Sequence, residues 1–213
     1  MTDDTRIAGQ AVERFLQELA SDSATPGGGP VAALEGAMGS ALISMVCNLT
    51  IDRAGYEEGQ ERVRGILVEA EQARASFLEL ADRDAHAFDG VMEAFTMPKE
   101  TDAEKAARSQ AIQRGYEAAA RPPLEIAKLA ATQMEFANEV TEIGNAQAAS
   151  DGACAAQALA ASVWSATYNV EINAAALKDP AKAQAFRDEV AMLRANAAAL
   201  LDAAGATFAS RLG

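Results

Sequence analysis

The residues that most often carry catalysis or hold metal ions are scarce in this sequence. Its 213 residues include one histidine and two cysteines, too few for a typical zinc site built from such side chains. The sequence has no Gly-Lys-Ser/Thr phosphate loop, and its triple glycine follows no strand pattern, so neither common nucleotide fingerprint fits. A Ser-His-Asp arrangement would need His86, which the helical pattern places on a surface. We therefore expect no metal ion and no bound cofactor.

Positive charge is also in short supply. Eighteen lysines and arginines stand against 31 acidic residues, which gives a net charge of −13 and repels phosphate backbones and anionic bilayers. This excludes nucleic acid and membrane surfaces as expected partners. Cys47 and Cys154 lie in apolar runs, which favours buried, reduced thiols over a disulfide. The first ten residues lack the basic and apolar regions of a secretory signal, so we expect a cytoplasmic protein.

Strand patterns are missing as well. Val, Ile and Thr never alternate over a strand-length run, and only 5% of the residues are aromatic although half are hydrophobic. The apolar content is carried mainly by alanine, which favours helix because it loses no side-chain entropy there. We predict an all-α protein, with residues 1–213 forming a single helical bundle and one domain.

Two long, nearly uncharged segments, residues 31–51 and 153–177, are predicted as buried helices of this bundle. The first has one charge, Glu35, and its length could span a bilayer. However, basic residues do not flank both of its ends. Gly36, Ser40 and Ser44 form a stripe of small residues along which another helix can approach closely. We favour a central bundle helix or a dimer seam over a membrane span.

The remaining pattern predicts further amphipathic helices. Residues 57–95 keep a heptad seam in which one position is the carboxylate Asp84. Thr101 with Glu104 indicates a capping box, Gly144-Asn145 indicates a helix stop, and a polar loop then extends to Asp151. These further helices are expected at residues 5–20, 57–95, 101–121, 124–143 and after the turn at 178–180, while Pro122-Pro123 is expected to end, kink or restart a helix.

Polar groups in apolar surroundings are the candidates for chemistry. Asp84 on the seam is costly to bury unless it is paired or has a function, so it is either half of a buried ion pair or a site residue. Asn48, Asn169 and Asn173 lie on the two apolar helices, as bundle hydrogen bonds or as ligand contacts. The glycines at 27–29 make either a plain turn or a backbone surface that a ligand or a neighbouring chain approaches closely.

These same residues, with several other segments, also resemble the sequence of a known protein family. The segments Phe15-Leu16-Gln17-Glu18-Leu19-Ala20, Thr25-Pro26-Gly27-Gly28-Gly29-Pro30 and Met45-Val46-Cys47-Asn48-Leu49-Thr50-Ile51 resemble bacterial methenyltetrahydrofolate cyclohydrolase and the formimidoyltetrahydrofolate cyclodeaminase domain. Further matches, in the expected order over nearly the whole chain, are Asp84-Ala85-His86-Ala87-Phe88, Pro98-Lys99, Gly144-Asn145, Ser150-Asp151 and Asn169-Val170-Glu171-Ile172-Asn173.

The resemblance implies a dimeric helical bundle that binds a tetrahydrofolate derivative as substrate, without a metal ion or nucleotide. It acts on the one-carbon bridge between N5 and N10. The implied catalytic residues are Asp84 and Asp151 as acid/base candidates and Lys99 as their polar partner. The implied substrate-binding residues are Thr25, Pro26, Gly27, Gly28, Gly29, Asn48, Asn145, Asn169 and Asn173.

The sequence favours hydrolysis of 5,10-methenyltetrahydrofolate to 10-formyltetrahydrofolate over cyclodeamination, since it contains no formiminotransferase domain. Two segments depart from the family pattern. Residues 52–55 replace a stretch in which the family often has several lysines, and residues 146–149 are unusual for their loop. These departures motivate a second hypothesis, a non-catalytic folate-binding or helical interaction protein. Independently of the resemblance, the two apolar helices predict a homodimer.

Overall fold

Every regular element in residues 6–23 and 25–212, the part of the chain that the computed structural model describes, is helical. The all-α prediction is therefore confirmed. The α-helices are α1 Val12–Leu19, α2 Gly28–Thr50, α3 Gln60–Ala87, α4 Asp89–Thr96, α5 Asp102–Ala119, α6 Arg121–Ile143, α7 Ala149–Ala175 and α8 Pro180–Arg211, and two short 3-10 helices are Ile7–Gly9 and Ala146–Ala148.

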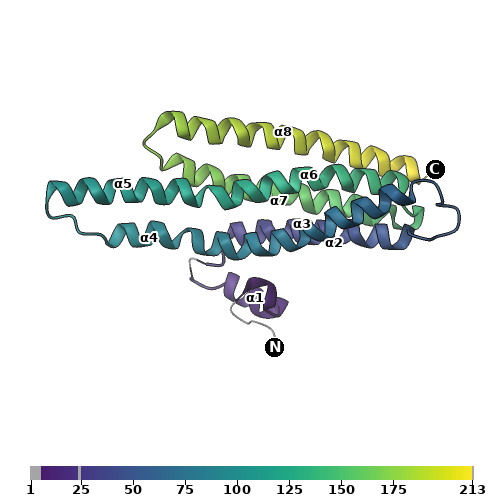
Figure 1. Cartoon of the computed structure of the whole chain (residues 1–213), viewed down its shortest axis with the longest axis horizontal. Helices are drawn as coiled ribbons and strands as arrows, with labels where there is room; N and C mark the ends of the chain where they lie inside the picture. The colour runs from purple at the N-terminus through teal and green to yellow at the C-terminus, as the bar shows by residue number, and fades with distance from the viewer. Residues whose placement is uncertain (1–5, 24, 213) are drawn as a thin grey trace.

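Helix α2 lies at the centre of the bundle. It packs against α3, α6 and α7, and α8 covers α6 and α7. In Figure 1, α6 continues nearly in line with α5, and α4 and α5 extend past the end of the other helices, while α1 lies to one side of the bundle. The core joins aliphatic and aromatic side chains from several of these helices, among them the fully buried Phe77, Ile43, Ile66, Ile126 and Met134.

The stripe of small residues on α2 packs inside the bundle. Gly36, Ser40 and Ser44 are all buried. A Cβ added at Gly36 would overlap the ring of Phe77 on α3, so this glycine is what lets the two helices approach closely. Of the two predicted roles, the stripe therefore has that of a central bundle helix.

Helix α2 is also the one described helix that is long and apolar enough to cross a membrane. Of its most apolar 18-residue window, 61% is buried inside the bundle. Core helices of water-soluble proteins share this length and hydropathy, and the packing of α2 against three other helices matches that behaviour.

The seam helix expected at residues 57–95 is divided in two. The α-helical hydrogen-bond pattern is interrupted at Phe88, although this residue keeps right-handed helical dihedral angles: its N–H donates to the His86 carbonyl, and Val91 N–H donates to the Phe88 carbonyl at 3.0 Å. These tight bonds, followed by the poor helix former Gly90, separate α3 from α4. The seam nevertheless continues across the break, because Val91 and Ala94 of α4 are buried.

Three other boundaries differ from the prediction. The first helix begins at Val12, since Ile7 N–H donates to an Asp82 oxygen at 2.8 Å and holds the preceding turn against α3; residue 5 lies outside the described part. Helix α7 begins at Ala149 instead of 153, so Asp151 is in its first turn and not in a loop. At Pro122 the helix restarts: the prolines occupy the first turn of α6, where no N–H is needed.

The predicted capping signals are confirmed. Glu104 N–H donates to Thr101 Oγ1 at 3.2 Å, and Thr101 N–H donates to Glu104 Oε2 at 2.8 Å, which together form the capping box of α5. Gly144 ends α6 with its N–H on the Val140 carbonyl. Local sequence is enough to set these helix ends because both partners lie within four residues of each other.

The two apolar helices each keep large apolar side chains exposed on one side, although Arg194 of α8 lies over the rings of Trp164 and Tyr168. Exposed apolar side chains on α2 are Met38, Met45 and Leu49, and those on α7 are Trp164, Tyr168 and Ile172. Cys47 is buried as expected, but Cys154 is exposed, because its position on α7 is on this outward side. We call these outward sides the α2–α7 face; its one acidic group on α2 is Glu35, which lies near Ser165 of α7.

We predict that Gly36→Ala destabilises the protein by about 1–3 kcal/mol, since the added methyl group overlaps the Phe77 ring in a packed core. The matched control is Gly65→Ala on α3, where an added Cβ meets nothing within 4 Å. This control should stabilise the protein by about 0.5–1 kcal/mol, because alanine is the better helix former. Urea unfolding measures both changes, and equal stability of the two variants would contradict the close approach.

Candidate active site

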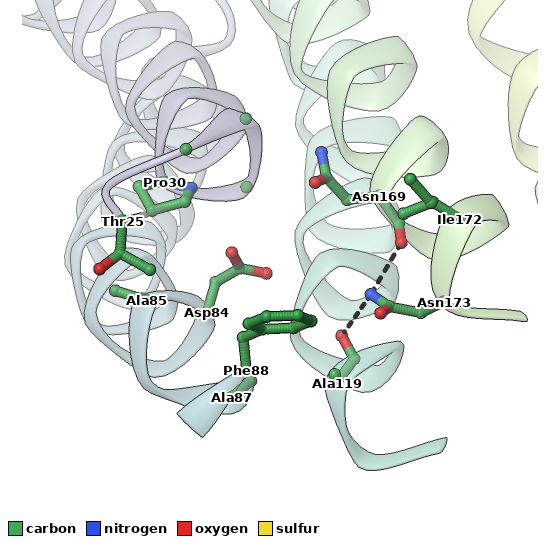
Figure 2. Close-up of a pocket in the computed structure, with 13 residues that line it drawn as sticks. Thr25, Pro30, Asp84, Ala85, Ala87, Phe88, Ala119, Asn169, Ile172 and Asn173 are labelled. Atoms are coloured by element: carbon green, nitrogen blue, oxygen red, sulfur yellow. Dashed lines mark hydrogen bonds between the residues drawn. The ribbon is translucent and has the colours of Figure 1, made fainter. Parts of the chain in front are cut away.

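A cavity of about 230 Å³ lies at one end of the bundle. Its walls are formed by the start of α2, the ends of α3 and α7, and the junction of α5 with α6. Figure 2 shows side chains from these separate segments converging on it. Its lining includes many of the residues predicted for the site: Thr25, Gly27, Gly28, Gly29, Asp84, Asn169 and Asn173.

Asp84 lies directly against the start of α2. A Cβ added at Gly29 would overlap the Asp84 carboxylate, and one added at Gly28 would lie 3.0 Å from the amide nitrogen of Asn169. The glycines are thus required by close approach across the cavity and not by a turn alone. Pro26, whose bond to Thr25 is cis, precedes them and does not line the cavity.

The Asp84 carboxylate has no ion pair or hydrogen bond within the described ranges, 6–23 and 25–212, although it is partly buried. The buried ion-pair interpretation therefore does not hold there. Burial raises the pKa of Asp84 from 3.8 to about 6. A carboxylate with a pKa near neutrality is suited to accept a proton and to return it, since an efficient acid/base group titrates near the working pH.

Asn169 and Asn173 face Asp84 across the cavity from α7 (Figure 2). Asn169 Nδ2 donates to the Ser165 carbonyl at 2.9 Å, and Asn173 Nδ2 donates to the carbonyls of Ala119 and Asn169 at 3.2 and 2.9 Å. Both amide nitrogens are thus used within the fold. Their Oδ1 atoms remain as hydrogen-bond acceptors for a ligand that carries N–H groups.

The N-terminus of α2 forms part of the cavity wall. No side chain caps it, and the first bond of the helix joins Val31 N–H to the Gly27 carbonyl at 3.3 Å. Uncapped amides at a helix start attract negative charge or a polar ligand atom. The prediction that the glycine segment presents backbone N–H groups is consistent with this position.

Apolar groups that the site prediction did not include complete the lining. Phe88, Ala119 and Ile172 contribute to the wall, and the Phe88 ring lies below Asp84 in Figure 2. Phe88 and Ile172 follow Asp84 and Asn169 by four and three positions, a spacing that places them on the same helix faces. Nothing in the sequence pattern indicates Ala119, which reaches the cavity because α5 ends there.

Four of the predicted site residues do not line this cavity within one copy of the chain. Lys99 precedes α5 and lines a different cavity. Asn48, Asn145 and Asp151 lie at the opposite end of the bundle, because Asp151 is 18 residues, or about 27 Å of helix, away from Asn169 along α7. Asn145 uses its amide inside the fold: Nδ2 donates to the Leu49 carbonyl at 3.3 Å, and Oδ1 accepts from Gln147 N–H at 3.1 Å.

Residues that could ligate a metal ion do not cluster in the described part of the chain: it contains no group of three or more His, Cys, Asp or Glu side chains placed to hold one. The cavity itself has one carboxylate, two amide acceptors and apolar walls. A mostly apolar lining with a few polar groups is typical of a site for a small molecule. The described structure is thus that of an all-α protein with a cavity suited to a small ligand.

Comparisons with known proteins identify the family to which this all-α chain belongs. The chain belongs to the Formiminotransferase-cyclodeaminase family, whose profile matches residues 11–192, and the resemblance stated from the sequence is thereby confirmed. Methenyltetrahydrofolate cyclohydrolase of Methylorubrum extorquens is 41% identical over 191 residues, which cover 90% of this chain and 92% of that protein.

Two further relatives carry cyclodeaminase names. Formimidoyltransferase-cyclodeaminase of Sus scrofa is 35% identical over 192 residues, which are 88% of this chain and 36% of that longer protein. The crystal structure of formiminotetrahydrofolate cyclodeaminase from Thermotoga maritima matches with a TM-score of 0.85 and 26% identity, over 96% of this chain and 98% of that one. The bundle is therefore the fold of a known cyclodeaminase.

The unpaired carboxylate predicts an unusual pH dependence of stability. The folded-state pKa of Asp84, about 6, lies above its value of 3.8 in an unfolded chain, so the folded state binds the proton more tightly. Wild-type stability should then fall as pH rises from about 4 to 6, by roughly 2–3 kcal/mol at 1.36 kcal/mol per pKa unit. Asp84→Asn should lack this loss and be the more stable protein at pH 7.

Urea unfolding of both proteins at pH 4, 5, 6 and 7 measures this difference. The two curves of unfolding free energy against pH should separate between pH 4 and 6 and stay parallel above. A variant that is less stable than wild type at pH 7 would instead indicate a stabilising partner for the carboxylate.

Proposed function

We propose that the protein is a cytoplasmic methenyltetrahydrofolate cyclohydrolase, which hydrolyses 5,10-methenyltetrahydrofolate to 10-formyltetrahydrofolate. The observation that carries the proposal is Asp84, a partly buried carboxylate without a cation, in a cavity whose other lining residues are all uncharged. The substrate supplies the missing positive charge, since its one-carbon bridge is a delocalised amidinium cation. The similarity to a protein named methenyltetrahydrofolate cyclohydrolase supports the same reaction.

The cavity offers a complementary partner for each part of the substrate. The amidinium cation is placed beside Asp84, where an apolar environment strengthens the attraction between the charges. The Oδ1 atoms of Asn169 and Asn173 accept from pterin N–H groups, and the ring of Phe88 packs on the pterin. Backbone N–H groups of the α2 start are available to the pterin carbonyl oxygen.

The reaction then needs one group that takes up and releases a proton. Water attacks the bridging carbon while the Asp84 carboxylate accepts one of its protons, and a neutral hydroxyl adduct forms. The bond from this carbon to N5 then breaks as N5 takes the proton from Asp84. The hydroxyl proton leaves to solvent as the formyl C=O forms on N10. One water molecule is consumed and one proton released, so folate and water suffice without a further cofactor.

A cyclodeaminase is the second candidate, because several relatives carry that name. That reaction starts from 5-formimidoyltetrahydrofolate and releases ammonia as the bridge closes, on the same folate scaffold. Asp84 would there hand a proton to the departing nitrogen. Incubating the protein with each folate, and following the near-ultraviolet absorbance of the methenyl bridge together with ammonia release, separates the two activities. Folate binding without turnover of either would instead indicate a non-catalytic binding protein.

Asp84→Asn should lower the turnover of 5,10-methenyltetrahydrofolate by about 10²- to 10⁴-fold, the usual contribution of a positioned acid or base. The helix content should not change, because asparagine fills nearly the same volume. In wild type, kcat/KM should rise with pH through about 6 as Asp84 ionises. The loss of methenyl absorbance, corrected for spontaneous hydrolysis, measures the rates.

The matched control is Asp89→Asn, which removes an exposed carboxylate from the first turn of α4. Its nearest recorded partner is His86 at 3.4 Å, and both side chains are largely exposed. This variant should keep wild-type turnover. Near-normal turnover of a folded Asp84→Asn protein would refute the assigned role of Asp84.

We further propose that two copies associate through the α2–α7 face. Met38 is 57% exposed and Ile172 72% exposed, and such large apolar groups along two adjacent helices are costly to leave in water. Burial raises the pKa of Glu35, and the hydrogen bond with the Ser165 side chain opposes this shift. The carboxylate of Glu35, the acidic group that α2 contributes to this face, is therefore partly shielded from water. A second copy covers this face symmetrically.

Met45→Glu should shift the protein from dimer to monomer, because it places a charge within the apolar α2–α7 face. Val68→Glu is the control, since Val68 is 53% exposed on α3 and lies outside this face. Light scattering at micromolar concentration should give about twice the chain mass for wild type and Val68→Glu. A monomeric wild-type protein would contradict the proposed association.

A further inference from the structure

A further cavity, of about 500 Å³, lies between α1 and the helices α2 and α3, on the side of the bundle where α1 is seen in Figure 1. Phe15 and Leu19 of α1, Val31 and Leu34 of α2 and Leu78 of α3 contribute to its apolar walls. The described residues that line it are all different from those that line the active-site cavity. We call it the α1 cavity.

Two polar side chains interrupt this apolar lining, Gln10 and Glu35. The amide nitrogen of Gln10 donates to Glu18 Oε2 at 3.0 Å, which fixes the orientation of the amide group. Gln10 Oε1 and Glu35 Oε2 are buried, and neither accepts a hydrogen bond from any residue that the structure describes. Buried acceptors without a donor cost free energy and are rare in folded proteins. A ligand that brings N–H donors to the α1 cavity would remove this cost.

The charge of the α1 cavity is also uncompensated. Glu35 is its one carboxylate, and among the described residues that line it there is no lysine or arginine. Glu35 also forms no ion pair with another described residue. Burial raises the pKa of Glu35, which shows that the carboxylate is poorly solvated where it lies. The counter-charge for this carboxylate has to come from outside the described part of the chain.

The lining defines which ligand fits. Apolar walls favour an alkyl or aryl body, and the carboxylate favours a positive group with N–H donors, because charge-assisted hydrogen bonds are stronger than neutral ones. The low dielectric of an apolar cavity strengthens this attraction, and it equally strengthens the repulsion of an anion. A volume of about 500 Å³ is in the usual range for small-molecule sites. A protonated primary amine on an apolar body meets all of these conditions.

We propose that the α1 cavity is a second ligand-binding site, which takes a small apolar amine in its protonated form. The ammonium group binds the Glu35 carboxylate, and the apolar body packs between α1 and the helices α2 and α3. The carbonyl oxygen of Gln10 is a further acceptor in the same cavity. This assignment does not depend on the reaction proposed for the active site, since the two cavities are lined by different residues.

The test uses three probes with the same alkyl chain: octylammonium, 1-octanol and octanoate. Isothermal titration calorimetry of wild type should show one octylammonium bound per chain, with a Kd at least about 10-fold lower than that of octanol. Octanoate should not bind, because its charge has the same sign as Glu35. Glu35→Gln should raise the Kd of octylammonium by about 10-fold or more and change that of octanol by less than about 2-fold.

The matched control is Asp84→Asn, which removes the carboxylate of the active-site cavity and changes the net charge equally. It should keep the octylammonium Kd within about 2-fold of wild type. Loss of binding in Asp84→Asn alone would place the ligand in the active-site cavity, and equal loss in both variants would show a general charge effect. Either result would overturn the proposal, as would wild type that binds no octylammonium or binds octanoate equally well.

A second copy of the chain is the competing occupant, because Met38 belongs to the α2–α7 face and also lines the α1 cavity. Met45→Glu separates the two possibilities, since it is designed to give a monomer. Octylammonium should bind this variant and wild type with the same Kd. Binding by the Met45→Glu monomer alone would show that a second copy covers the α1 cavity, and the assignment to a small amine would then be wrong.

Discussion

The contact between Asp84 and the start of α2 is the constraint on which the site depends. A carboxylate occupies a seam position of α3 where the pattern otherwise places aliphatic groups, and it meets Gly29, where no side chain fits. Burying this group without a cation costs free energy. The packing of α2 against α3, α6 and α7 offsets that cost, so the fold holds a reactive group that the surrounding residues do not neutralise.

Local signals in the sequence were enough to predict the helices. The capping box at Thr101 and the stop at Gly144 depend on residues a few positions apart, and both were predicted. The seam predicted the inward face of α3, and its one polar member, Asp84, proved to be the cavity carboxylate. The break at Phe88 was not predictable from the seam, since the apolar spacing continues through it into α4.

The predicted site was less complete because order along a sequence does not give distance in space. Asp151 and Asn169 belong to one helix and to opposite ends of it, so both cannot reach one small cavity in a single chain. Asn145 closes a loop and has its amide engaged there. Lys99 is close in sequence to Asp84, but α4 and the following turn carry it to another cavity. Such outcomes depend on which helices pack together, which periodicity does not specify.

The net charge of a chain governs its long-range repulsion of other anions, but it does not give the charge at each point of the surface. A chain at −13 repels a long polyanion such as nucleic acid, yet fields near a surface are set by the closest groups, because salt screens charges more than about 10 Å away. The cavity lined by Lys99, Arg108 and Lys178 shows this, since it gathers positive charge locally in a chain that is acidic as a whole. The same reasoning applies to Asp84, whose low-dielectric surroundings leave it as the dominant charge facing a cationic substrate.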